Sequence, residues 1–120
     1  MNEELLNIRS QQFLEIGKSS IRKGFFDLAA FHLEQALQLR LKYFLAKRIG
    51  YFSKTHMLSS LFKEAERVEP KLRDFVNRNK ERIEELEVAY TGSRYLPIKY
   101  TKDKVEKLLK FVEEAFKVIG

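Results

Sequence analysis

The sequence of 120 residues contains no cysteine and no tryptophan, and only two histidines and two prolines. Without cysteine the chain forms no disulfide, and it offers no thiol nucleophile and no thiolate metal ligand. Two histidines without an acidic cluster beside them argue against a zinc or iron site. We therefore expect no metal and no cofactor, and we look to other side chains for function.

Long hydrophobic runs are absent as well. No apolar run approaches the ~18 to 20 residues that a membrane-spanning helix needs. The N-terminal residues MNEELLNIRS begin with acidic side chains and lack the apolar core of a signal peptide. These absences predict a cytoplasmic protein with no membrane contact. The length predicts one domain over residues 1–120, long enough to bury a single core.

Basic side chains are plentiful, and the formal net charge is +6. Charge alone leaves two interpretations open. One is a solvated surface rich in lysine, arginine and glutamate, as in many heat-adapted proteins. The other is an anionic partner such as a nucleotide, RNA or an acidic protein.

The stretch 27–49 organises the chain, because it contains neither glycine nor proline and Gly50 follows it directly. Asp27 is the expected N-cap. The apolar residues recur in steps of three and four, at Phe26, Ala30, Leu33, Leu37, Leu41 and Phe44. The residues expected to face solvent form a narrow strip of Asp27, Glu34, Gln38 and Lys42. So narrow a polar side predicts a central helix that is covered on two or more sides.

Four further helices are expected, over 3–23, 55–68, 71–90 and 102–119. The first should bury Leu5, Ile8, Phe13, Ile16 and Ile21. Ser53 or Thr55 should cap the helix 55–68, and Thr101 or Asp103 should begin the last. The polar segment 77–82 could kink or break its helix. The whole pattern predicts an all-α, antiparallel up-and-down bundle of four to five helices.

Residues 91–101 are expected to be non-helical, because Gly92 and Pro97 interrupt them. Arg94 and Lys99 are candidate phosphate ligands, since arginine offers a planar fork of donors and lysine a point charge. Tyr90 and Tyr95 beside them have rings that can stack on a base. The plainer interpretation is an ordinary connection whose aromatic side chains close the end of the bundle.

Three more side chains are candidate binding residues. His32 lies on a mostly apolar side of the central helix, where a hydrogen-bonded structural histidine is the alternative. His56 follows Thr55 in the expected first turn of a helix, and could instead contact a bound anion. Lys42 lies on the polar strip, where an ordinary solvated face is the alternative.

Four segments taken together resemble HEPN domains over nearly the whole chain. They are GFFDLA at 24–29, FHLEQALQ at 31–38 followed by Lys42, THMLSSL at 55–61, and YTGSRY at 90–95. The resemblance implies a helical bundle, usually a dimer, with a nucleotide or RNA role. Many members partner a minimal nucleotidyltransferase in toxin–antitoxin-like modules, and many others are metal-independent RNases with an Arg-x(4–6)-His motif.

The arginine of that motif corresponds to Arg94, but the histidine is absent, because no histidine follows His56. Cleavage by the 2′-hydroxyl needs a group that titrates near neutral pH, which histidine supplies and lysine normally does not. Our hypothesis is a non-catalytic, homodimeric protein that binds nucleotide or RNA phosphate through Arg94 and Lys99 and partners a nucleotidyltransferase. The alternatives are an RNase in which Lys99 or His56 replaces the histidine, and a purely structural dimer.

Overall fold

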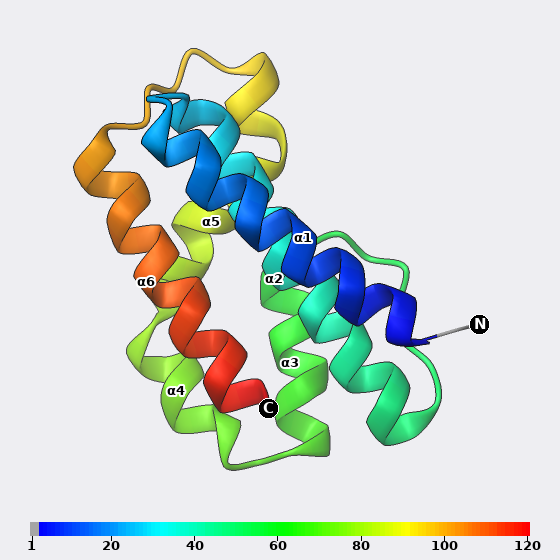
Figure 1. The fold of residues 1–120 in the computed structure, drawn as a ribbon. Coiled ribbons are helices and arrows are strands. Elements are labelled where there is room, and N and C mark those ends of the chain that lie inside the picture. Colours follow the sequence, from blue (N-terminus) through cyan, green and yellow to red (C-terminus); the bar gives the residue numbers. More distant parts are fainter. Residues whose placement is uncertain (1–2) are drawn as a thin grey trace.

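The computed structural model describes residues 3–120, apart from the side chains of residues 93 and 94. Within that range the chain forms α1 (Glu3–Arg22), α2 (Phe26–Ile49), α3 (Leu58–Val68), α4 (Leu72–Arg78), α5 (Lys80–Tyr95) and α6 (Lys102–Ile119). Figure 1 shows these helices packed as one bundle, with α1 and α6 on the near face. No strand occurs among the described residues, and the predicted all-α helical bundle is confirmed.

The central position of α2 is confirmed, because α2 contacts α1, α3, α5 and α6. Its side chains Leu33, Leu37 and Leu41 have no solvent exposure. The helix ends as expected at Gly50, whose φ of 80° is left-handed and whose N–H donates to the Ala46 carbonyl. The apolar stripe of α2 is therefore the centre of the hydrophobic core.

Small residues form the face of α1 that meets α2. Ser10, Gly17 and Ser20 are buried, and a Cβ added at Gly17 would lie 3.0 Å from Leu33 Cδ2. Such residues allow the two helix backbones to approach closely. Gly24, with a φ of 79°, makes the tight turn that brings α2 back along α1.

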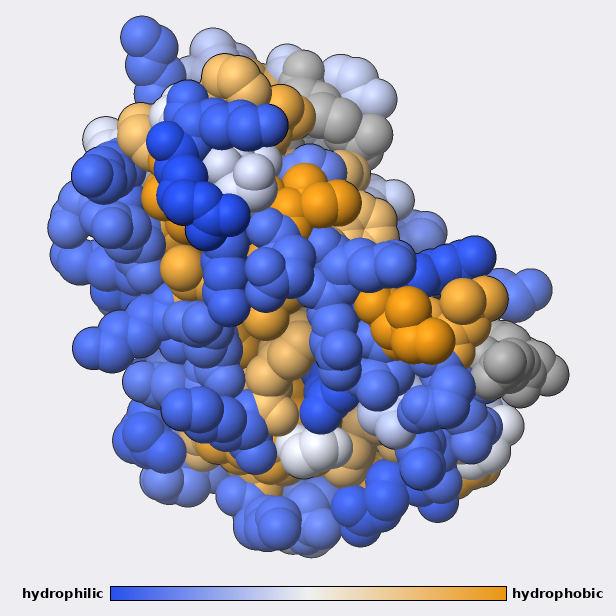
Figure 2. Space-filling model, viewed as in Figure 1, coloured by the Kyte–Doolittle hydropathy of each residue, from blue (hydrophilic) through white to orange (hydrophobic). Residues whose placement is uncertain are grey.

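The expected buried face of α1 is therefore wrong at three positions. Leu5, Ile8 and Ile16 are 40%, 48% and 45% exposed, because α1 turns its small residues inward. Leu14 and Ile21 are the half-buried residues that pack against the core. Figure 2 shows hydrophobic patches among polar side chains on the face that carries α1.

The predicted N-caps fare differently. Thr101 caps α6 as expected, with its hydroxyl accepting from the Lys104 N–H at 3.1 Å. Asp27 is not a cap, because α2 begins one residue before it. Its Oδ1 instead accepts from the backbone N–H of Tyr100 at 3.3 Å. Asp27 therefore ties the α5–α6 connection to the start of α2.

The helix expected over 55–68 begins later, at Leu58. Neither proposed residue caps it, because both hydroxyls are used within the preceding segment. Ser53 Oγ accepts from the Thr55 N–H, and Thr55 Oγ1 accepts from the Met57 N–H, both at 3.1 Å. Residues 50–57 are therefore an ordered, non-helical connection that places His56 just before α3.

Two helix boundaries on the C-terminal half also differ from expectation. The stretch 71–90 is two helices, because Asn79 leaves helical geometry and its side-chain amide donates to the Phe75 carbonyl at 2.8 Å. One continuous helix was expected here, and the break falls within the polar segment 77–82 that could kink or break it. Residues 91–95 are helical, contrary to prediction. A Cβ at Gly92 would lie 3.1 Å from Ile98 Cδ1, so the absent side chain leaves room for the connection that folds back over this turn.

Candidate functional site

The polar strip of α2 is buried, which corrects the expectation of a solvated face. Glu34 is 0%, Gln38 4% and Lys42 7% exposed. Only Asp27, at the start of the helix, is exposed. Spacings of four residues place Glu34, Gln38 and Lys42 on successive turns, so they form one continuous polar line inside the bundle.

Glu34 is held by two neighbouring amides of the same helix. Gln35 Nε2 donates to its Oε1 at 2.8 Å, and Gln38 Nε2 donates to its Oε2 at 2.9 Å. Burial raises the pKa of Glu34 to about 7, although these hydrogen bonds and the charge of Lys42 oppose the rise. The buried polar line therefore contains a carboxyl group whose pKa is close to neutral pH.

Gln38 connects Glu34 to the connection that precedes α3. Its Oε1 lies 3.0 Å from His56 Nδ1, and its Nε2 lies 3.5 Å from the His56 carbonyl oxygen. The His56 ring is stacked on Tyr90 of α5, with centroids 5.2 Å apart and planes inclined by 13°. His56 itself is exposed, so a chain of contacts runs from the buried Glu34 to the surface.

Lys42 continues the line further along α2. Burial lowers the pKa of its ammonium, while the charge of Glu34 opposes the shift. The Nζ lies 5.6 Å from the centre of the Phe52 ring, a favourable cation–π arrangement. Lys42 is thus covered by the 50–57 connection, and its charge acts on Glu34 from within the bundle.

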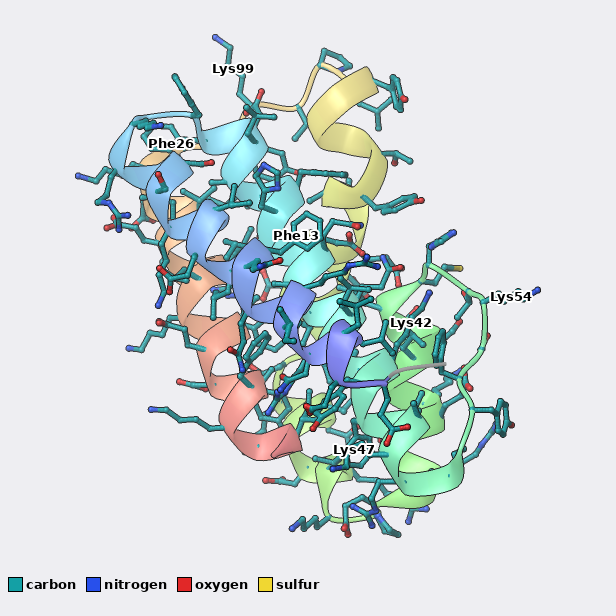
Figure 3. The ribbon with its side chains drawn as sticks, turned by 45° about the vertical axis from the view of Figure 1, so that its right-hand side comes forward. Phe13, Phe26, Lys42, Lys47, Lys54 and Lys99 are labelled. Atoms are coloured by element: carbon teal, nitrogen blue, oxygen red, sulfur yellow. The ribbon has the colours of Figure 1, made fainter. Side chains whose placement is uncertain are left out.

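Lys99 lies elsewhere. It lines an open hollow of about 360 Å³ with Tyr100 and with residues 24–28 at the start of α2. Lys42 stands sixteen residues beyond Phe26, or about 24 Å along the helix at a rise of ~1.5 Å per residue. Figure 3 shows Lys99 and Phe26 at the same end of the bundle, with Lys42 well away from them. These two lysines therefore do not share a site.

His32 also lies apart from His56. Its ring stacks on Phe13 of α1 at 5.8 Å and meets Phe31 edge-on at 5.6 Å. Burial lowers the pKa of His32, and its Nδ1 has no hydrogen-bond partner among the described residues. These contacts match a structural histidine wedged between α1 and α2, although no hydrogen bond satisfies it.

Arg94 and Tyr95 belong to the last turn of α5 rather than to a loop. The side chain of Arg94 lies outside the described residues. Its backbone position is four residues after Tyr90, one helical turn or about 6 Å further along α5. Tyr95, the last residue of the helix, is 73% exposed.

The candidate site is therefore assembled from three parts of the chain: Gln38 of α2, His56 of the connection, and Tyr90 of α5. Sequence reasoning singled out the histidine and the tyrosine but treated Glu34 and Gln38 as solvated. The sequence did contain an indication of their burial. A helix that is apolar on nearly every side is covered on nearly every side, so its few polar residues are buried as well. Among the described residues no group of His, Asp and Glu is arranged to hold a metal ion.

The protein is an all-helical bundle in which a buried polar line reaches the surface at the stacked rings of His56 and Tyr90. The HEPN domain matches residues 3–120, and the chain belongs to the HEPN family. Comparison with curated proteins finds no match. Membership of the family indicates a nucleotide- or RNA-related function. None of the described helices is both long enough and apolar enough to cross a membrane.

Proposed function

We propose that this protein binds a nucleotide, or the phosphate and base of a nucleic acid, at the surface formed by His56, Tyr90 and the last turn of α5. The supporting observation is the stack of His56 on Tyr90, in which Gln38 holds the His56 ring. Tyr90 lies one helical turn before Arg94 on α5. Aromatic side chains can stack on any nucleic-acid base, because every base has a π-face. Arginine offers phosphate a planar fork of donors.

The binding is non-catalytic in this proposal. No histidine follows Arg94 in the sequence, so the proton acceptor and donor of the family's RNase motif are missing at their usual spacing. The net charge of +6 favours association with an anionic ligand. Lys99 lines the hollow beside Phe26. Its neighbours Ile98 and Tyr100 face Gly92 of α5, so Lys99 lies at the same end of the bundle as the last turn of α5 (Figure 1).

The proposal is tested by titrating fluorescent nucleotides and short RNA into the purified protein. Arg94→Ala should weaken binding by about 1.5 to 3 kcal/mol, the usual contribution of a charge-assisted hydrogen bond. Arg94→Lys should recover only part of the loss, because a point charge cannot make the bidentate contact. Arg78→Ala on α4 is the matched control, since it removes one exposed cation paired with Asp74. Equal losses for both alanine variants would mean that only overall charge matters.

A second candidate function is metal-independent RNA cleavage. The observation that favours it is His56, which stacks on the helix that carries Arg94 and has its Nδ1 oriented by Gln38. Incubation of labelled single-stranded RNA with the protein in the absence of metal distinguishes the two. Cleavage that is lost in both Arg94→Ala and His56→Ala would replace the binding proposal, whereas intact RNA would support it.

We also propose that the protein is a homodimer and that it partners a minimal nucleotidyltransferase in a toxin–antitoxin-like module, as many HEPN proteins do. The exposed Leu5, Ile8 and Ile16 of α1 support an interface, because the bundle itself leaves them uncovered. Light scattering at tens of micromolar, an order-of-magnitude concentration for interfaces of moderate affinity, should give twice the chain mass of 14.3 kDa. A particle of one chain mass would contradict the dimer. The partner is tested by co-purification with the product of a neighbouring nucleotidyltransferase gene.

A further inference from the structure

The amide of Gln38 is fixed in one orientation by its surroundings. Above its pKa of about 7, Glu34 is a carboxylate, which only accepts hydrogen bonds. The Gln38 atom that lies 2.9 Å from Glu34 Oε2 is then the –NH₂ group. The same nitrogen also lies 3.5 Å from the carbonyl oxygen of His56, a second acceptor. Turning the amide over would place its oxygen against both acceptors. The amide oxygen therefore faces His56.

The orientation of Gln38 in turn determines where the imidazole of His56 carries its proton. An amide oxygen only accepts, so Nδ1 at 3.0 Å must be the protonated nitrogen of the neutral ring. Its Nε2 then carries the lone pair. Histidine side chains free in water prefer the opposite tautomer, so the arrangement imposes a state that the ring would not adopt by itself.

The remaining nitrogen is available at the surface. No described residue hydrogen-bonds His56 Nε2, and the side chain is exposed. The stack on Tyr90, inclined by 13°, fixes the plane of the ring and thus the direction of the lone pair. An oriented lone pair accepts a hydrogen bond from a donor, but it cannot donate one to a phosphate oxygen.

We propose that Glu34 and Gln38 are positioning residues that hold His56 with its proton on Nδ1, so that Nε2 accepts a hydrogen bond from a hydroxyl or amino group of a nucleoside. This inference rests on the proposed function and deepens it. In this arrangement His56 recognises the nucleoside part of the ligand, whereas Arg94 binds the phosphate. Because the tautomer is set within the protein, it is present before any ligand binds.

The tautomer is measured directly by long-range proton–nitrogen correlation spectra of the imidazole rings in the unliganded protein. The chain has only two histidines, so His32 serves as an internal control. At about pH 8.5 imidazole side chains are neutral, and wild-type His56 should show its proton on Nδ1. A wild-type ring with its proton on Nε2 would overturn the inference.

Two variants of Gln38 separate positioning from packing. Gln38→Leu removes the acceptor, and His56 should revert to the Nε2-protonated form while the His32 signals stay in place. The double variant Glu34→Gln with Gln38→Glu keeps an acceptor for Nδ1 and a donor between positions 34 and 38, and His56 should retain its proton on Nδ1. Glu34→Gln removes the carboxylate that fixes the orientation of the Gln38 amide, so His56 should show a mixture of its two tautomers. Identical tautomers in wild type and Gln38→Leu would contradict the positioning role.

The ligand side is tested with adenosine, 2′-deoxyadenosine and inosine monophosphates. Adenosine monophosphate should move the His56 Nε2 signal. A loss of affinity of several-fold for the deoxy compound would identify the ribose hydroxyl as the donor, and a similar loss for the inosine compound would identify the base amino group. Binding that leaves the His56 signals unmoved, or equal affinity for all three, would overturn the inference alone. No binding of any nucleotide or RNA would contradict the proposed function, while the tautomer measurement would still stand.

Discussion

The two sides of α2 are equally buried and chemically opposite. On one side Leu33, Leu37 and Leu41 have no solvent exposure and belong to the hydrophobic core cluster. On the other, Glu34 finds its hydrogen-bond partners within α2, and Gln38 bonds both to Glu34 and to His56 of the 50–57 connection. Burial alone therefore does not distinguish core from site. The chemical nature of the contacting groups distinguishes them. On the polar side, the contacts continue through Gln38 to the exposed His56.

The largest effect should come from the apolar side. Leu37→Ala should lower the free energy of unfolding by about 2 to 5 kcal/mol, because the surrounding helices cannot collapse around the missing atoms. Leu28→Ala, at a 46% exposed position of the same helix, is the control and should cost far less. Chemical denaturation measures both. A loss below about half a kcal/mol at Leu37 would show that this side is not the centre of the core.

The polar side should reveal itself through pH. The pKa of Glu34 is raised by burial from 4.5 to about 7, so the folded protein holds this proton more tightly than the unfolded chain. Its contribution to stability is complete below about 4.5 and is lost as the pH rises to about 7. The loss should amount to at most about 3.5 kcal/mol, at ~1.4 kcal/mol per pKa unit.

Glu34→Gln cannot ionise and should flatten that part of the stability curve. Denaturation in urea at several pH values between 4.5 and 8 provides the measurement, with Glu114→Gln, an exposed carboxyl on α6, as the control. If wild type and Glu34→Gln show the same dependence on pH, the carboxyl is not buried as an acid, and the contrast between the two sides of α2 is weaker than the structure indicates.

Gly17 of α1 lies against the apolar side of α2, with no room for a side chain. A Cβ there would lie 3.0 Å from Leu33 Cδ2 and 3.2 Å from its Cγ, so Gly17→Ala must displace Leu33. We expect a loss of about 1 to 3 kcal/mol, the usual cost of overpacking. Gln12→Ala, on the exposed side of α1, should be near neutral. A stabilised Gly17→Ala protein would mean that the helices separate easily and that helix propensity outweighs packing.

The smallest change is expected outside both sides of α2, on the surface of α1. Ile16→Gln should alter monomer stability by no more than about 0.5 kcal/mol, because the side chain is 45% exposed. Its effect should appear instead in assembly, as a shift toward single chains in light scattering. Unfolding of the variant would place Ile16 within the core, as the sequence pattern alone had predicted.

That last contrast shows what the sequence does and does not determine. The apolar stripe of α2 was predictable residue by residue, since uninterrupted steps of three and four leave little choice. The face of α1 was not, because Leu5, Ile8 and Ile16 outrank glycine and serine in hydrophobicity. Close backbone approach at Gly17 decided the matter, and a single-sequence pattern carries no information on how closely helices approach.

The site was predictable in part. His56 and Tyr90 were candidates on chemical grounds, but nothing local indicates that they stack across two separate segments. Lys99 was grouped with Arg94 because they are near in sequence, whereas α5 continues to Tyr95 and the chain then turns toward Phe26. Gly92 was a misleading signal, because it lies within α5 despite its low helix propensity, at a position where a Cβ would come within 3.1 Å of Ile98 Cδ1.

The hydrogen bond between Asp27 and Tyr100 joins positions 73 residues apart. By contrast, the α1–α2 hairpin closes over the short turn at Gly24. Contacts between distant positions must bear the entropy of a long loop before they form, so they arise later in folding than local ones. The hairpin should therefore appear early, and the end of α5 should gain its final surroundings only when the α6 segment arrives. During synthesis, the chain must therefore be released as far as Tyr100 before the α5–α6 connection can bind to the start of α2.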